Sequence, residues 1–132
     1  MKYLLALFGD EGGWEDVSPE EMRAGMEPWN KFEQELHDAG VKLAGDGLQT
    51  SATAITIKHG DGDERVVTDG PFAETKEQLG GFYLLECSDA DEALEWAKKV
   101  PIRPGGTVEV RPIMDYTEFG FEPPSEKVEA AS

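Results

Sequence analysis

The sequence predicts an α+β domain in which two helices pack on one β-sheet. Three observations lead to this prediction. Two apolar stripes have helical spacing, several short apolar or alternating runs have strand character, and the segments between them are rich in glycine and proline. The elements follow the order β-α-β-β-β-β-α-β, which mixes strands and helices within one unit. The 132 residues have the length of a single domain.

The first half of the domain begins with a buried strand and a capped helix. Residues 2–8 are almost continuously apolar, as in a strand covered on both faces. Ser18 can cap a helix, and Glu21 completes a capping box. One helical face then follows, and Gly40 is the expected stop; the face consists of Met22, Met26, Trp29, Phe32 and Leu36. Because Pro28 removes a backbone hydrogen bond, we predict a kink or break near residues 24–27.

The second half contains a hairpin, a strand, a helix and a last strand. Strands are predicted at 41–48, 53–59, 64–68, 81–87 and 107–113, with a hairpin turn at 60–63. Ser88 with Asp91 predicts the start of the second helix, and Pro101 follows its end. Its apolar stripe consists of Ala93, Leu94, Ala97 and Val100.

This order corresponds to two βαβ halves with an inserted hairpin, which resembles a ferredoxin-like βαββαβ sandwich. Both helices would then cover one face of the sheet. The other face would present either Phe82 and Leu84 or Tyr83 and Leu85. Because an apolar face needs a cover, we expect a homodimer in which two sheets meet.

The charge excludes several classes of partner. The chain has 28 acidic and 12 basic residues, a net charge of −16 and a pI near 4.3. Nucleic acids and anionic membrane surfaces are therefore not expected as ligands, because both bind through Lys and Arg. The longest apolar run, residues 3–8, is far shorter than the roughly 20 residues that cross a bilayer. With no signal peptide pattern, we expect a cytoplasmic protein.

The acids also suggest a domain boundary. Residues 10–38 have a net charge of −8, and residues 115–132 have a net charge of −4 with two prolines in the middle. We therefore predict a domain over residues 1–114 and an acidic extension over residues 115–132, partly disordered or loosely docked. A solubilising terminus is favoured over a partner-binding arm.

Metal and cofactor motifs are missing from the sequence. Cys87 is the single cysteine, so disulfides and cysteine-rich zinc sites are excluded, and we expect it in the core. A calcium loop starting at Asp61 fails because Arg65 and Phe72 occupy ligand positions. His37 fits a helix C-terminus and His59 a solvated strand end. No metal and no cofactor is expected, since neither a dinucleotide fingerprint nor a P-loop occurs.

One segment stands out as a candidate site. Asp69-Gly70-Pro71 has turn chemistry after a β-branched run, and residues 73–79 then bring several polar side chains into a short connector. A carboxylate at the end of a strand could act as an acid or base. From the residues alone, a structural turn and a functional site are equally well supported.

The run from Asp69 to Tyr83, Asp-Gly-Pro-Phe-Ala-Glu-Thr-Lys-Glu-Gln-Leu-Gly-Gly-Phe-Tyr, resembles the signature of the YCII-related family in its DGPF-domain branch. The resemblance extends over residues 1–114. It implies a dimeric α+β barrel built from ferredoxin-like halves, mostly without an assigned activity. Some members of the wider family are thought to use a His–Asp pair for acid–base chemistry. Genes of this branch often neighbour extracytoplasmic-function sigma factors.

The sequence matches only part of the site that the family resemblance implies. The position of the family histidine corresponds to Trp29 or Asn30, and neither can act as a general base. Asp69 matches as a site carboxylate, and Lys76 is its candidate partner for developing negative charge. Glu74 and Phe72 are candidate ligand contacts. Two functions stay open: acid–base chemistry on, or binding of, a small organic molecule near Asp69, and a non-catalytic module that contacts another protein such as a sigma factor.

Overall fold

A computed structural model of the chain describes residues 1–12 and 16–122. Its main sheet has four strands, β1 (Lys2–Gly9), β2 (Lys42–Gly47), β5 (Gln78–Glu86) and β6 (Thr107–Pro112). The strands are antiparallel and lie in the order β2-β5-β1-β6. This is the ferredoxin-like arrangement, so the predicted fold class is confirmed. β5 begins three residues before the expected strand, which shortens the polar connector.

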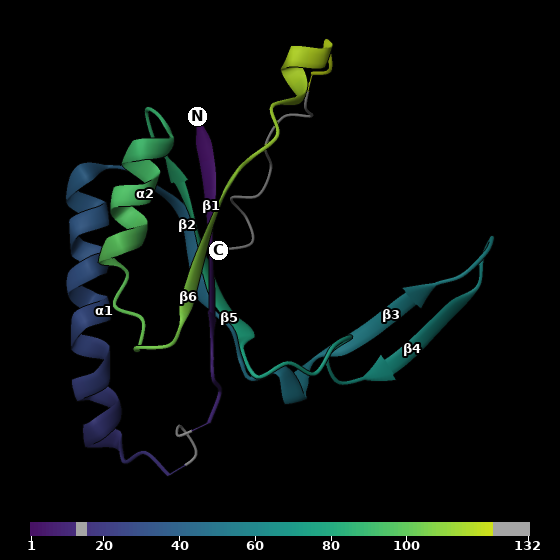
Figure 1. The fold of residues 1–132 in the computed structure, drawn as a ribbon, viewed down its shortest axis with the longest axis horizontal. Coiled ribbons are helices and arrows are strands. Elements are labelled where there is room, and N and C mark those ends of the chain that lie inside the picture. The colour runs from purple at the N-terminus through teal and green to yellow at the C-terminus, as the bar shows by residue number, and fades with distance from the viewer. Residues whose placement is uncertain (13–15, 123–132) are drawn as a thin grey trace, which may run out of the picture.

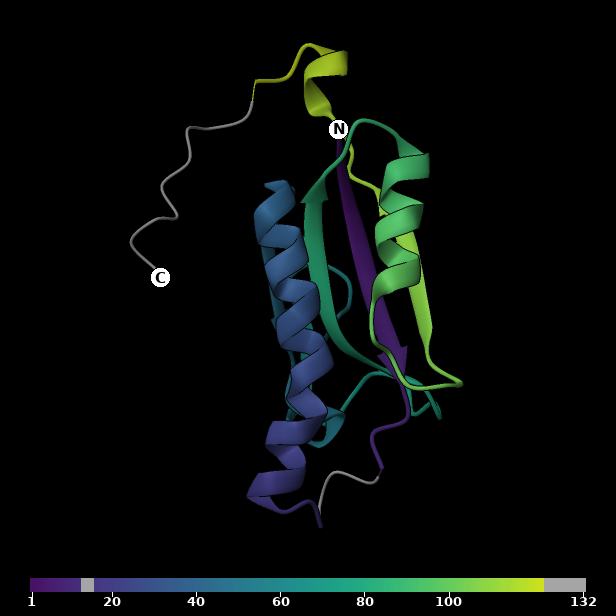
Figure 2. The ribbon, with the colours of Figure 1, turned by 90° about the vertical axis from the view of Figure 1, so that its left-hand side faces the viewer.

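Two helices, α1 (Pro19–Ala39) and α2 (Ala90–Lys99), cover the same face of this sheet (Figures 1 and 2). Alternate residues of a strand point to opposite faces, and the core takes one set from each strand. Three leucines are completely buried in this core: Leu5 of β1, Leu36 of α1 and Leu85 of β5. Other core residues are Tyr3, Leu7, Phe32, Val41, Tyr83, Cys87, Ala93, Ala97 and Val100.

The ends of α1 match the sequence prediction, but its middle does not. Ser18 and Glu21 form the capping box, and Gly40 ends the helix with φ of 69°. The helix is continuous from Pro19 to Ala39 with Pro28 inside it, so a break near residues 24–27 is excluded, and the alternative of a kink stays a prediction. The carbonyl that Pro28 leaves unbonded belongs to Ala24, which is exposed, and water can satisfy it. Beyond this point, Phe32 and Leu36 anchor the helix on the sheet.

The start of α2 differs by one residue from the prediction. Asp89, and not Ser88, caps the helix by accepting a hydrogen bond from the Glu92 backbone N–H at 2.9 Å. The Glu92 carboxylate in turn accepts from the Ser88 backbone N–H at 2.6 Å. Aspartate caps as well as serine does, and this start places Ala93 and Ala97 in the core.

The inserted hairpin does not join the main sheet. β3 (Ile55–His59) and β4 (Arg65–Asp69) pair only with each other, after a short 3-10 turn, η1 (Ser51–Thr53). The hairpin extends away from the sheet on the side opposite to the helices (Figure 1). We call residues 54–70 the arm. All five residues of β4 are exposed.

After β6, the chain forms a second short 3-10 turn, η2 (Tyr116–Phe119). We call residues 113–121 the C-terminal segment. Residues 123–132, which contain most of the predicted acidic extension, lie outside the described residues, as do residues 13–15. Within the described parts, neither helix has the length and apolar character needed to span a bilayer.

Candidate functional site

The Asp69-Gly70-Pro71 turn joins the arm to the connector that leads into β5. Gly70 has φ of 99°, a region that favours glycine. Its N–H donates to the Ala54 carbonyl at 2.7 Å, and its carbonyl accepts from Thr56 Oγ1 at 2.7 Å. The turn is therefore held on both sides by the opposite strand of the arm.

Several polar side chains of the connector stabilise the connector itself. Thr75 Oγ1 donates to the Glu77 carbonyl, and Gln78 Nε2 donates to the carbonyls of Ala73 and Thr75 at 3.3 and 3.1 Å. Glu77 Oε1 accepts from Thr107 Oγ1 at 2.9 Å, which ties the connector to β6. A purely structural role therefore explains the polar side chains of Thr75, Glu77 and Gln78.

The glycines at the end of the motif also have a structural reason. The Leu48 N–H donates to the Gly80 carbonyl at 2.8 Å. A Cβ on Gly81 would lie 3.0 Å from the Asp46 carbonyl oxygen of β2, which is closer than such atoms normally approach. Glycine at position 81 therefore lets β2 and β5 pair closely beside the connector.

The charged residues predicted for the site remain unused by the fold. Asp69, Glu74 and Lys76 are exposed. Over residues 1–12 and 16–122, none of the three side chains forms a hydrogen bond or an ion pair. The structure of the single chain does not bring Asp69 and Lys76 into contact.

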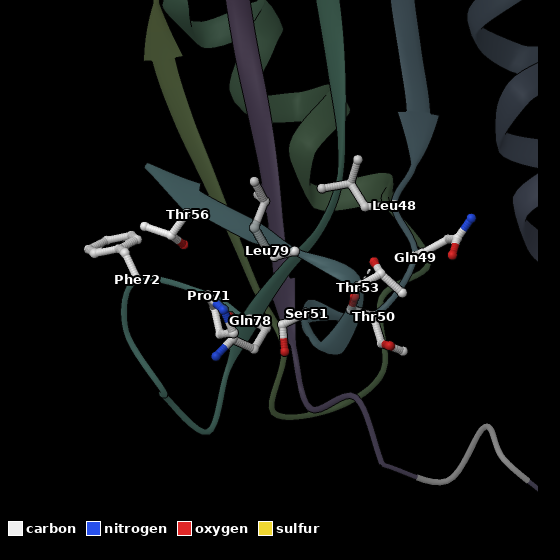
Figure 3. A pocket seen from close by; sticks show the side chains of 11 residues that line it. Leu48, Gln49, Thr50, Ser51, Thr53, Thr56, Pro71, Phe72, Gln78 and Leu79 are labelled. Carbon is white, nitrogen blue, oxygen red and sulfur yellow. Dashed lines mark hydrogen bonds between the residues drawn. The ribbon is translucent and has the colours of Figure 1, made fainter. Parts of the chain in front are cut away.

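A hollow of about 380 Å³ opens between the η1 region and the Pro71–Phe72 side of the motif turn (Figure 3). Its volume falls within the range of small-molecule sites, roughly 300–1,000 Å³. The lining combines hydroxyl and amide groups with apolar side chains and contains no ionisable group: Leu48, Gln49, Thr50, Ser51, Thr53, Ala54, Thr56, Pro71, Phe72, Gln78 and Leu79.

A second hollow, of about 520 Å³, continues from the first along the arm. The two share Thr56, Pro71 and Phe72, and the second adds Ile57, Lys58, His59, Val66 and Thr68. We call the two together the Phe72 groove. The Phe72 side chain is 91% exposed at the junction, although an aromatic ring of this size is normally buried.

The strand register separates Asp69 from this groove. Asp69 lies opposite Ile55, and Val67 lies opposite Ile57. The Thr56–Thr68 pair alternates with these pairs and therefore lies on the other face of the arm. Phe72 is thus the predicted site residue that lines the groove, whereas Asp69 belongs to the opposite face.

Glu11 supports the groove, and sequence reasoning missed it. Its carboxylate accepts hydrogen bonds from the Ser51 backbone N–H and from Ser51 Oγ, both at 2.7 Å. These bonds fasten the η1 wall to the end of β1. The partners are 40 residues apart, so no local pattern connects them.

Other reactive side chains belong to the core or the surface. Burial raises the pKa of the Cys87 thiol, which disfavours the thiolate. Burial and the nearby Glu33 raise the pKa of Tyr83 above its usual range. As predicted, His37 lies in the last turn of α1 and His59 at the solvated end of β3, and both are exposed. Among the described residues, no three acidic, histidine or cysteine side chains come together as metal ligands.

The comparison with known proteins gives a family and no activity. The YCII-related domain matches residues 1–117. An uncharacterised protein of Rhizobium meliloti (strain 1021) is 38% identical over 118 residues, which cover 88% of this chain and 94% of that protein. This agreement extends over the sheet, both helices, the arm and the motif. The chain therefore belongs to the YCII-related family.

Proposed function

We propose that the chain acts as a homodimeric binding protein for a small organic molecule, held in the Phe72 groove beside the Asp69 motif. The observation that carries this proposal is the groove itself. It has the volume of a ligand site, and one wall is the motif turn that hydrogen bonds hold in place. A rigid wall lowers the ordering cost of binding.

The lining of the inner hollow favours an uncharged, partly apolar ligand, whereas Lys58 and His59 line the outer hollow. The inner hollow offers hydroxyl and amide groups for hydrogen bonds and no ionisable side chain to pair with a charge. Phe72 and Leu79 are exposed at its rim and gain most if a flat apolar group covers them. An aromatic ring or a short acyl chain with a neutral polar group meets both requirements.

The open face of the sheet supports the homodimer. Tyr3, Leu5 and Leu7 point toward the helices, so Leu4 and Phe8 lie on the opposite face. Phe82 and Leu84 share this face through their pairing with β1, and all four are partly exposed. A second copy of the sheet would cover them, with Glu109 and Arg111 at the rim.

A melting screen tests the ligand proposal. Neutral aromatic and acyl compounds are added to the chain at millimolar concentration, and the melting temperature is recorded. We expect Phe72→Ala to abolish the shift that a hit produces, and the matched change Leu94→Ala on the exposed side of α2 to preserve it. Hits that shift both variants equally would show binding elsewhere and contradict the proposal.

Acid–base chemistry by Asp69 and Lys76 is a further step within this proposal. Asp69 has no hydrogen-bond or ion-pair partner among the described residues and lies beside the groove, but it faces the other side of the arm. Binding is therefore the better supported function. If Asp69 is a catalytic base, Asp69→Asn eliminates turnover of a bound hit and leaves its affinity unchanged. A variant with undiminished turnover would exclude this role.

The alternative function is a module that contacts another protein, such as a sigma factor. The observation that favours it is the apolar face of the arm, where Ile55, Ile57 and Val67 are more than half exposed. A protein contact predicts that changes on this face affect assembly and leave the melting shifts unaffected. Changes in the Phe72 groove should then alter the melting shifts and leave the assembly unaffected.

A further inference from the structure

Two apolar surfaces of the chain have no cover among the described residues. On the arm, Ile55, Ile57 and Val67 form one face and are 67%, 55% and 64% exposed. In the C-terminal segment, Met114, Tyr116, Phe119 and Phe121 are 61%, 56%, 76% and 62% exposed. Exposed apolar patches of this kind usually mark sites of interaction.

The C-terminal segment has a defined shape. Asp115 accepts a hydrogen bond from the Thr117 backbone N–H at 3.0 Å, and Gly120 ends the turn with φ of 75°. The rings of Tyr116 and Phe121 lie 6.3 Å apart in a tilted arrangement. Because the turn is already formed, a partner that packs on it has little ordering cost to overcome.

The two surfaces lie at opposite ends of the sheet and on the same side of it. The arm leaves from the end where Gln78 pairs with Gly9, whereas the C-terminal segment leaves from the end where Pro112 pairs with Tyr3. Both extend on the side away from the helices (Figure 1). Within one chain the length of the sheet therefore separates them.

A two-fold axis perpendicular to the strands brings them together. When a second copy covers the open sheet face with its strands reversed, its arm end lies beside the segment end of the first copy. The symmetry then forms the same contact twice, as an isologous interface requires. The direction in which the arm extends places it alongside any such second copy (Figure 1).

The charges of the two surfaces permit the contact. Residues 113–122 contain Asp115, Glu118 and Glu122 and no basic residue. On the Ile55–Ile57–Val67 face of the arm, the strand register places Arg65 and Asp69, whose charges cancel, whereas Lys58 lies on the opposite face with Thr56 and Thr68. The acids of the arm turn, residues 61–64, lie beyond the last strand pair, so the contact would end before them.

From these observations we propose that, in the homodimer, the Ile55–Ile57–Val67 face of each arm packs on the C-terminal segment of the partner. The inference rests on the proposed homodimer and extends it. It gives the two faces of the arm different roles. One face docks on the second copy, and the Thr56–Thr68 face, which supplies most of the arm residues that line the Phe72 groove, remains free.

Disulfide trapping tests the contact. Val67→Cys and Phe119→Cys are made in separate, differently tagged chains, which are mixed and mildly oxidised. Cys87 is buried and does not compete. We expect a covalent heterodimer from this pair and none when Leu94→Cys replaces Phe119→Cys. Equal trapping by Leu94→Cys, or a product dominated by Val67→Cys homodimers, would overturn the proposal.

Sedimentation of the unoxidised variants gives an independent measurement. Phe119→Ala should raise the dissociation constant of the dimer about tenfold, as expected for a buried aromatic anchor, and Leu94→Ala should leave it unchanged. Both side chains are exposed in the protomer, so folding should survive. If Phe119→Ala leaves the dissociation constant of the dimer unchanged, the arm contact alone is overturned. If the wild-type chain sediments as a monomer, the homodimer is overturned as well.

Discussion

The main sheet and the arm contain similar residues, but the main sheet buries them and the arm leaves them exposed. β5 and β4 are both rich in apolar or β-branched residues, and both pair antiparallel with a neighbour. In β5, Tyr83 and Leu85 are buried beneath the helices, whereas every residue of β4 is exposed. Strand propensity therefore specifies strand formation in both regions, but it does not specify burial.

This difference in burial implies different roles: residues of the main sheet stabilise the fold, and residues of the arm are available for interaction. The main sheet has helices on one face and forms the core, so substitutions there should destabilise the fold. The arm has no layer packed on it within the described chain, and a two-stranded ribbon is marginal by itself. Its apolar side chains are therefore more informative about partners than about folding.

The largest expected effect separates these two regions directly. Leu85→Ala should lower the free energy of unfolding by about 2–5 kcal/mol, because it leaves a cavity at a fully buried position. Val66→Ala in the arm, where the side chain is 55% exposed, should change it by less than about 0.5 kcal/mol. Urea denaturation measures both, and equal losses would show that the arm belongs to the core.

A pair of glycines in β2 tests how tightly the main sheet is packed. A Cβ at Gly45 would lie 2.7 Å from Tyr83 Cδ1 and 2.9 Å from the Phe82 carbonyl oxygen, whereas a Cβ at Gly47 meets nothing within 4 Å. We expect Gly45→Ala to cost about 1–3 kcal/mol through overpacking. Gly47→Ala is the matched control. Thermal unfolding that lowers both variants equally would contradict this explanation.

The junction between the two regions should respond locally. Gly70 has φ of 99°, so Gly70→Ala should strain the turn by about 1 kcal/mol. Hydrogen exchange should then accelerate about fivefold over residues 54–70 and stay unchanged in β1 and β5. Acceleration throughout the sheet would show that the arm and the main sheet unfold together.

The smallest expected effect lies at the start of α1 and depends on pH. The Ser18 backbone N–H and hydroxyl lower the pKa of Glu21 in the folded chain. Its stabilisation is therefore present above the ordinary glutamate pKa of about 4.3 and is lost as the pH falls through the lowered value. Glu21→Gln should melt below wild type at pH 7 and approach it at acidic pH. A difference that grows with acidification would contradict this assignment.

The local rules predicted much of the fold. Ser18 with Glu21, Gly40 and the glycines of the hairpin turn act through neighbouring backbone atoms, so their patterns are readable along the chain. The Pro28 break failed because the exposed end of α1 tolerates a missing hydrogen bond while Phe32 and Leu36 hold the helix. The second cap is Asp89 and not Ser88, because the Asp89 carboxylate accepts the hydrogen bond from the Glu92 backbone N–H, while Ala93 and Ala97 lie in the core as predicted.

The candidate site was less predictable. The motif forms the predicted turn, and Phe72 lines the groove, but its role as a ligand contact stays a prediction. The roles of Asp69, Lys76 and Glu74 stay predictions. The opposite wall comes from residues 48–56, and Glu11, which follows β1 and is 40 residues away from Ser51 in the sequence, holds this wall through hydrogen bonds. Residue type indicates that Asp69 could react, but only the register of the arm shows which face it occupies.

The sequence by itself determined the main elements, the caps of α1, the turns, the acidity and the family motif, because these depend on residues close along the chain. The tertiary structure decided which strands are covered and that the arm is separate from the main sheet. It also decided that the groove and Asp69 lie on opposite faces of the arm. These features depend on contacts between distant segments and on strand register. A shift of one residue would exchange the two faces of the arm.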